Sequence, residues 1–156
     1  MKKLLSILAI LGFIMGTQVF ASDRDEAQAF FKSYVNAANT YSATLPNFYS
    51  PNAKITRQVI KPNGQLVDIN VPMSTYLKQM KMNSSIAKMR KYKNYYSGIT
   101  AEAVSNGYKI NSTRKPSTGG APLKVTMVVQ KQANGKWLIV EELMQTREQI
   151  FLKYAK

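Results

Sequence analysis

The sequence predicts an α+β domain in which helices pack on one face of an antiparallel sheet. Three observations support this class. An amphipathic helical pattern follows residue 22, Asn-Gly occurs three times between strand-like runs, and a second helical pattern separates the first two of these pairs. Helices that precede and interrupt a series of hairpins are typical of this class.

The first helix is predicted from a capping signal and an apolar stripe. Asp23 and Glu26 have the spacing of a capping box. We expect the helix to end near Asn39, and residues 40–50 to form a short second helix or a packed turn. The apolar residues of the stripe recur at helical spacing: Ala27, Phe30, Phe31, Tyr34, Val35 and Ala38.

Each Asn-Gly pair predicts a β-hairpin, because both central residues of a type I′ turn need a positive φ, which Asn-Gly tolerates best. The pairs are Asn63-Gly64, Asn106-Gly107 and Asn134-Gly135. The strands expected on either side are 55–61 with 65–71, 96–105 with 108–114, and 123–131 with 137–144.

A longer helix is predicted between the first and second hairpins. Ser74 is its expected N-cap. The apolar positions that follow keep only a rough helical period, and Asn83-Ser84-Ser85 is a candidate kink or interruption. The expected order is therefore helix, short helix, hairpin, helix and two further hairpins.

The N-terminus predicts export. A positive start at Met1-Lys2-Lys3 precedes an apolar run from Leu4 to Met15, and Val19-Phe20-Ala21 fits signal peptidase. We expect a signal peptide over residues 1–21, cleaved near Ala21-Ser22, and one domain over residues 22–156 that is periplasmic or secreted. An uncleaved membrane anchor is the alternative.

The order of elements resembles the nuclear transport factor 2-like superfamily, here as an exported bacterial member. Residues 125–144, VTMVVQKQANGKWLIVEELM, are similar to that family's last hairpin. The resemblance implies a cone, in which a curved antiparallel sheet wraps around the N-terminal helices. It also implies a SnoaL-like relative, either an isomerase or dehydratase related to the ketosteroid isomerases, or a non-catalytic binder, since fold does not determine function.

Composition favours binding over catalysis. The chain has no His and no Cys, which excludes a histidine base, a cysteine nucleophile, a Ser-His-Asp triad, a His/Cys zinc site and disulfides. Enzymes of the resembled family usually place an Asp/His or Asp/Tyr set in the cone. No two carboxylates have a spacing typical of a glycosidase or a metal site, so we expect no metal and no cofactor.

Asp68 and Glu142 are the weak catalytic candidates. Asp68 alternates with the apolar Val67 and Ile69, which favours a solvated side chain over a base with a raised pKa. Glu141 and Glu142 point to opposite sheet faces, so one of them faces inward. Its expected role is an ion pair with a cation, for which Arg57, Lys124 and Arg147 are candidates.

Nine tyrosines suggest a pocket with apolar walls and hydrogen-bonding tips, which suits an amphipathic ligand. Ordinary core and rim positions are the alternative interpretation. The candidate pocket residues are Tyr34, Tyr49, Arg57, Tyr76, Tyr96, Trp137 and Glu142.

The chain is strongly basic, with 22 Lys and Arg against 8 Asp and Glu and a net charge of +14. The densest run, residues 88–93, ends a predicted helix, where the helix dipole favours cations. We expect a cationic surface attracted to an anionic envelope surface or an acidic partner, and no nucleic acid.

The resulting hypothesis is an exported, non-catalytic protein that binds a small amphipathic or anionic ligand, or a protein partner, in a cone-shaped pocket. Two alternatives stay open. One is an isomerase or dehydratase that uses a carboxylate and tyrosines. The other is an interaction subunit of a cell-envelope assembly, with a homodimer formed through the sheet face.

Overall fold

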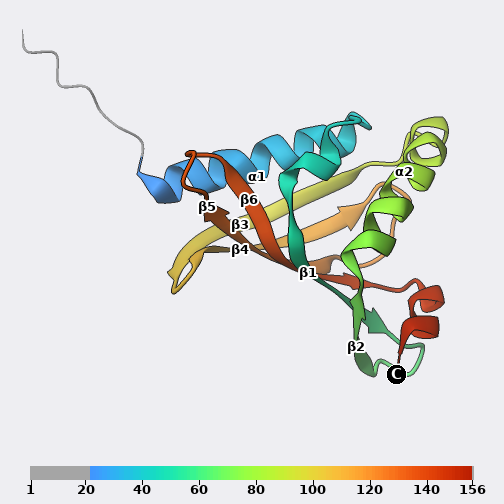
Figure 1. Cartoon of the computed structure of the whole chain (residues 1–156). Helices are drawn as coiled ribbons and strands as arrows, with labels where there is room; N and C mark the ends of the chain where they lie inside the picture. Colours follow the sequence, from blue (N-terminus) through green and yellow to red (C-terminus); the bar gives the residue numbers. More distant parts are fainter. Residues whose placement is uncertain (1–21, 156) are drawn as a thin grey trace, which may run out of the picture.

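The computed structural model describes residues 22–155, which form two long α-helices, two short 3₁₀-helices and a six-stranded sheet (Figure 1). The predicted α+β class is confirmed. The signal-peptide prediction falls on residues 1–21, outside the described residues. None of the helices in residues 22–155 is long and apolar enough to cross a membrane. The elements are α1 (Asp23–Asn39), η1 (Leu45–Phe48), β1 (Tyr49–Ile60), β2 (Leu66–Val71), α2 (Met73–Met89), β3 (Asn94–Val104), β4 (Gly107–Pro116), β5 (Leu123–Lys131), β6 (Trp137–Thr146) and η2 (Gln149–Tyr154).

The sheet has the strand order β2-β1-β6-β5-β4-β3. All three predicted hairpins are present, as the antiparallel pairs β1–β2, β3–β4 and β5–β6. β1 and β6 pair in parallel, which joins the first hairpin to the other two strand pairs. The hairpin signals did not predict this pairing, and β1 begins at Tyr49 rather than at the expected Ile55.

The hairpin turns differ from the predicted type I′ geometry. In the first loop the Gly64 amide donates to the Lys61 carbonyl at 2.8 Å, and only Gly64 has a positive φ, of 83°. This is a type I turn followed by a left-handed glycine in a bulge. Asn63 instead uses its side chain, whose Oδ1 accepts from the Gln65 amide at 3.0 Å. Asn106 and Asn134 also lack a positive φ.

The helix starts also differ from the predicted caps. Ser22, not Asp23, is the N-cap of α1, and its hydroxyl accepts from the Asp25 amide at 3.2 Å. α2 begins after Pro72 without a side-chain cap, so Ser74 has no capping role. It continues through residues 83–85 to Met89 without the interruption that the sequence suggested.

The core lies between α1 and the inner face of the curved sheet, and α1 packs across β3 and β4 (Figure 1). Ala27, Phe31 and Tyr34 of α1 are buried there. α2 packs on β1 at the other end of the sheet. None of its residues is fully buried, because the partly buried side of α2 faces a cavity rather than a filled core.

The end of α1 is joined to the start of β3 by an amide pair. The Asn39 side chain donates to the Asn94 carbonyl at 2.8 Å and accepts from the Asn94 amide at 2.9 Å. The side chain thus makes the two hydrogen bonds that a neighbouring strand would make. This contact holds the α1 terminus beside the cavity wall.

We expect Gly107→Ala to destabilise the protein by more than the roughly 1–2 kcal/mol that a left-handed conformation alone costs. Gly107 has a φ of 144°, and an added Cβ would lie 2.1 Å from the Val129 carbonyl oxygen. Gly64→Ala is the matched control, because its φ is also positive but no atom lies within 4 Å of the added Cβ. Urea unfolding measures both variants, and an equal loss would contradict the steric argument.

Candidate functional site

Glu142 is buried on the inner face of β6, with 1% of its surface exposed. Its cross-strand neighbours are Ile55 on β1 and Met127 on β5, and Ile110 follows on β4. The carboxylate therefore interrupts an apolar row across the sheet. Glu141 points to the outer face and is exposed, as alternation along a strand requires.

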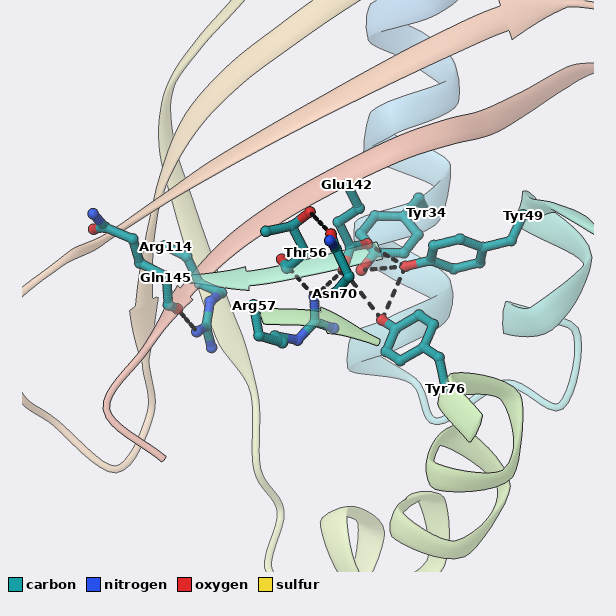
Figure 2. A network of polar contacts seen from close by, with 9 residues as sticks. All are labelled: Tyr34, Tyr49, Thr56, Arg57, Asn70, Tyr76, Arg114, Glu142 and Gln145. Atoms are coloured by element: carbon teal, nitrogen blue, oxygen red, sulfur yellow. Dashed lines mark hydrogen bonds and ion pairs between the residues drawn. The ribbon is translucent and has the colours of Figure 1, made fainter. Parts of the chain in front are cut away.

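Three groups from two elements, β1 and α2, contact Glu142 (Figure 2). The Arg57 Nη1 atom donates to Oε1 at 2.7 Å, and the Tyr49 hydroxyl donates to Oε2 at 2.5 Å. The Tyr76 hydroxyl also donates to Oε1, at 3.3 Å. Both carboxylate oxygens are therefore engaged, and Arg57 is the cation that pairs with the inward glutamate.

A chain of phenols extends from the carboxylate. The hydroxyl oxygens of Tyr49 and Tyr34 lie 3.3 Å apart, and those of Tyr49 and Tyr76 lie 3.2 Å apart. The rings of Tyr49 and Tyr76 meet nearly edge to face, with centroids 5.4 Å apart. Because each phenol has a single hydrogen, Tyr49 and Tyr76 cannot donate to Glu142 and to another phenol at the same time.

Burial determines the ionisation of this cluster. It raises the pKa of the Tyr34 and Tyr49 phenols well above their ordinary value, and the Glu142 charge adds to the effect. Burial opposes the charged form of Arg57, but the neighbouring Tyr76 and Glu142 groups outweigh it and raise the Arg57 pKa. The Arg57 guanidinium also lies over the Tyr76 ring, 4.8 Å from its centroid. The cluster therefore contains one stable ion pair and neutral phenols.

A cavity of about 520 Å³ opens beside the cluster, between α1, α2 and the sheet. Its polar wall contains Arg57, Tyr34, Tyr76 and Tyr96. The loop after α1 and the cavity-facing side of α2 form its rim. Its apolar wall includes Leu45, Pro46, Met80, Ala87, Met144 and Phe151.

Arg114 is a second buried cation behind the cavity wall, and it pairs with no carboxylate among the described residues. Its Nη1 donates to Asn94 Oδ1 at 3.0 Å and to the Tyr92 hydroxyl at 3.3 Å, and its Nη2 donates to the Gln145 carbonyl at 2.9 Å. Its Nε is buried without a partner. Tyr92 and Asn94 themselves line the cavity, so one uncompensated positive charge lies behind that wall.

The structure brings together most of the residues that the sequence suggested for a pocket. Tyr49 and Glu142 contact the polar wall from behind, through Arg57 and Tyr76. Trp137 is a correction, because it lies outside this cavity and its Nε1 donates to Glu26 at 3.1 Å. The four suggested residues that line the cavity are Tyr34, Arg57, Tyr76 and Tyr96.

Two further residues complete the comparison with the sequence. Asp68 is exposed on β2, where it accepts from Gln58 Nε2 at 2.9 Å, and it has no hydrogen bond to the cluster around Glu142. Arg114 was missed. Its signal was the alternation with Ile110 and Ser112, which places all three on the inner face of β4.

Solved structures with a similar fold come from several kinds of protein. The yeast UBP3-associated protein BRE5 superposes with a TM-score of 0.61 and 20% identity, over 80% of this chain and 96% of that one. A putative dehydratase of the NTF2-like family from Streptomyces avermitilis has a TM-score of 0.59 and 11% identity, over 79% and 94%. An NTF2-like protein from Cytophaga hutchinsonii has a TM-score of 0.56 and 10% identity, over 81% and 99%.

Neither a family model nor a curated protein matches the sequence. At these identities the structural likeness shows a shared fold and nothing about activity.

We expect Glu142→Leu and Arg57→Met each to lower the free energy of unfolding by about 3–5 kcal/mol, because each leaves the opposite charge buried without its partner. The double variant Arg57→Met/Glu142→Leu removes both charges and is expected to recover much of the loss. Lys109→Met is the control, since its ion pair with Glu102 is exposed at 3.9 Å. Urea unfolding of the wild type, the two single variants and the double variant gives the coupling energy between Arg57 and Glu142. Additive losses of stability would contradict the ion-pair interpretation.

We expect the stability to fall steeply above about pH 10, because burial raises the pKa of Tyr34, Tyr49, Tyr76 and Tyr96 in the folded state. There the unfolded state loses phenolic protons that the folded state keeps, so each such phenol costs about 1.4 kcal/mol per pH unit. Chemical unfolding as a function of pH measures the slope. Tyr49→Phe should reduce it, and an unchanged slope would contradict the assignment.

Proposed function

We propose that this chain, which has the nuclear transport factor 2-like fold, binds a small amphipathic anion in the cavity beside Arg57 and catalyses no reaction on it. The observation that carries the proposal is the charge of the wall. Among the buried groups near the cavity, Arg57 and Arg114 contribute two positive charges, and Glu142 contributes one negative charge. One buried positive charge is therefore left without a carboxylate partner among residues 22–155.

The anionic end of a ligand has a candidate partner in Arg57. The hydrogen bonds that Arg57 makes all use Nη1, which donates to Glu142 and to the Thr56 carbonyl. The planar guanidinium has five N–H donors, so Nη2 and Nε have donors left for a carboxylate. The neighbouring phenols of Tyr76 and Tyr96 line the same wall and add hydrogen-bonding tips.

The rest of the cavity suits an apolar body. Side chains such as Met80, Met144 and Phe151 form its apolar wall, and its volume of about 520 Å³ lies in the range of small-molecule sites. Methionine is unbranched and flexible, so it adapts to ligands of different shape. A ligand with a charged end and an apolar chain or ring therefore matches both walls.

The positions of the carboxylates favour binding over catalysis. Glu142 does not line the cavity, and its two oxygens already accept three hydrogen bonds. Asp68 is exposed and lies outside this cavity. With no histidine in the sequence, neither a carboxylate nor an imidazole lines the cavity to abstract a proton from a ligand. The isomerase or dehydratase alternative therefore has no specific observation in its favour.

Export belongs to the proposal and is supported by the pattern of residues 1–21. Binding of a protein partner is the alternative function, because one protein of similar fold, BRE5, forms a complex with the deubiquitinase Ubp3. The outer sheet face of the present chain carries hydrogen-bonded polar side chains, such as Gln58 with Gln145 at 2.8 Å and Asn111 with Thr126 at 3.1 Å. A homodimer through that face is therefore no part of the proposal.

We expect decanoate to bind roughly 10–100 times more tightly than decanol, because a hydrogen bond to a charged group contributes about 1.5–3 kcal/mol. Isothermal titration calorimetry of the purified chain measures both ligands. Ser84→Trp should fill the cavity and abolish binding, and Ser74→Trp is the matched control on the exposed side of the same helix.

Two results would overturn the proposal. One is equal affinity for decanoate and decanol, which would remove the role of the positive wall. The other is equal binding by the Ser84→Trp and Ser74→Trp variants, which would place the ligand outside the cavity.

A further inference from the structure

α2 has an apolar stripe that faces away from the protein. Met82, Ile86 and Met89 are 73%, 45% and 76% exposed. Their spacing of four and three residues places them on one side of the helix. Tyr76 and Ala87 lie on the other side and line the cavity. The outward stripe therefore has no partner within residues 22–155.

Six cations accompany this stripe. No acidic residue occurs between Asp68 and Glu102 in the sequence, and none of the ion pairs among the described residues involves these cations. The segment from α2 to the start of β3 is therefore uniformly positive on its exposed side. The six exposed cations are Lys78, Lys81, Lys88, Arg90, Lys91 and Lys93.

We propose that this outward side of α2 docks on an anionic lipid surface. An amphipathic helix that combines an apolar stripe with lysines lies in the membrane interface, with its apolar side chains among the acyl chains and its cations near the headgroups. Long lysine side chains reach the headgroups while their stems cover apolar surface. The charge complementarity is direct, because anionic headgroups supply the negative charges that this segment lacks.

A second copy of the chain is a poorer occupant of this surface. A symmetric contact places the same patch on both subunits, and here that would oppose two sets of six cations. An acidic protein would complement the charge, but it would also need a groove matched to a convex helix. A fluid lipid interface accommodates the stripe without such a groove.

Docking would bring the cavity close to the lipid surface, since the opposite side of α2 forms part of the cavity wall. Docking would then allow a ligand to pass between the cavity and the bilayer, a step that rests on the proposed function of the cavity. The docking itself does not depend on it, because Met82, Ile86, Met89 and the lysines are outside the cavity or on its outer rim.

The test uses the full chain and two kinds of vesicle, phosphatidylcholine alone and an equal mixture of phosphatidylcholine and phosphatidylglycerol. We expect co-sedimentation with the mixed vesicles, weakened by added salt. Lys78→Gln/Lys81→Gln/Lys88→Gln should lower the partition coefficient about a hundredfold. Lys115→Gln/Lys124→Gln/Lys136→Gln removes the same charge from exposed sites elsewhere and should have a much smaller effect.

The apolar stripe is tested in the same assay. Met82→Ser/Met89→Ser should weaken binding to the mixed vesicles, whereas Leu66→Ser/Ile150→Ser, which removes exposed apolar side chains elsewhere, should not. With Trp137→Phe as background, Met82→Trp should show a blue-shifted emission only with the mixed vesicles. Equal losses of vesicle binding in the test and control variants would overturn the proposal, and so would an unshifted tryptophan emission. Binding to an acidic protein without any partition onto vesicles would overturn it as well.

Discussion

The buried ion pair of Glu142 and Arg57 is the constraint on which the arrangement of this domain depends. A carboxylate in an apolar row of the sheet costs several kcal/mol of desolvation unless a cation and hydrogen-bond donors compensate it. Arg57 comes from β1, the neighbouring strand, and the contact at 2.7 Å requires the parallel pairing of β1 with β6. The ion pair thus favours the one register of these strands that satisfies it.

The tyrosines around the pair connect elements that are distant in the sequence. Tyr34 comes from α1, Tyr49 from the first residue of β1 and Tyr76 from the first turn of α2. The Tyr49 and Tyr76 hydroxyls donate to Glu142, and the Tyr34 hydroxyl contacts that of Tyr49. Tyr34 and Tyr76 also line the cavity, so part of the network around the buried charge gives the cavity its polar side.

Local sequence patterns predicted much of this fold, but they did not predict the pairing of strands that are distant in the sequence. Asn-Gly marked all three hairpins, because a tight turn needs residues that tolerate unusual φ values, although only the glycine uses that freedom. The Glu141-Glu142 pair predicted one inward carboxylate with a cationic partner, since alternation along a strand is a local property. The parallel contact of β1 with β6 has no local signature. Trp137 was misplaced because an aromatic residue after a turn suits a rim as well as a pocket.

The excess positive charge is found in two environments, one buried and one exposed to solvent. Arg114 is buried, so its charge acts on the cavity through a medium that screens it poorly. The six cations near α2 are exposed and screened by salt, so they act on whatever approaches the surface. α2 lies between these two regions, and it is also the long helix without a buried residue. Displacing it exposes less apolar surface than displacing α1, so of the two long helices it is the one whose movement costs less free energy.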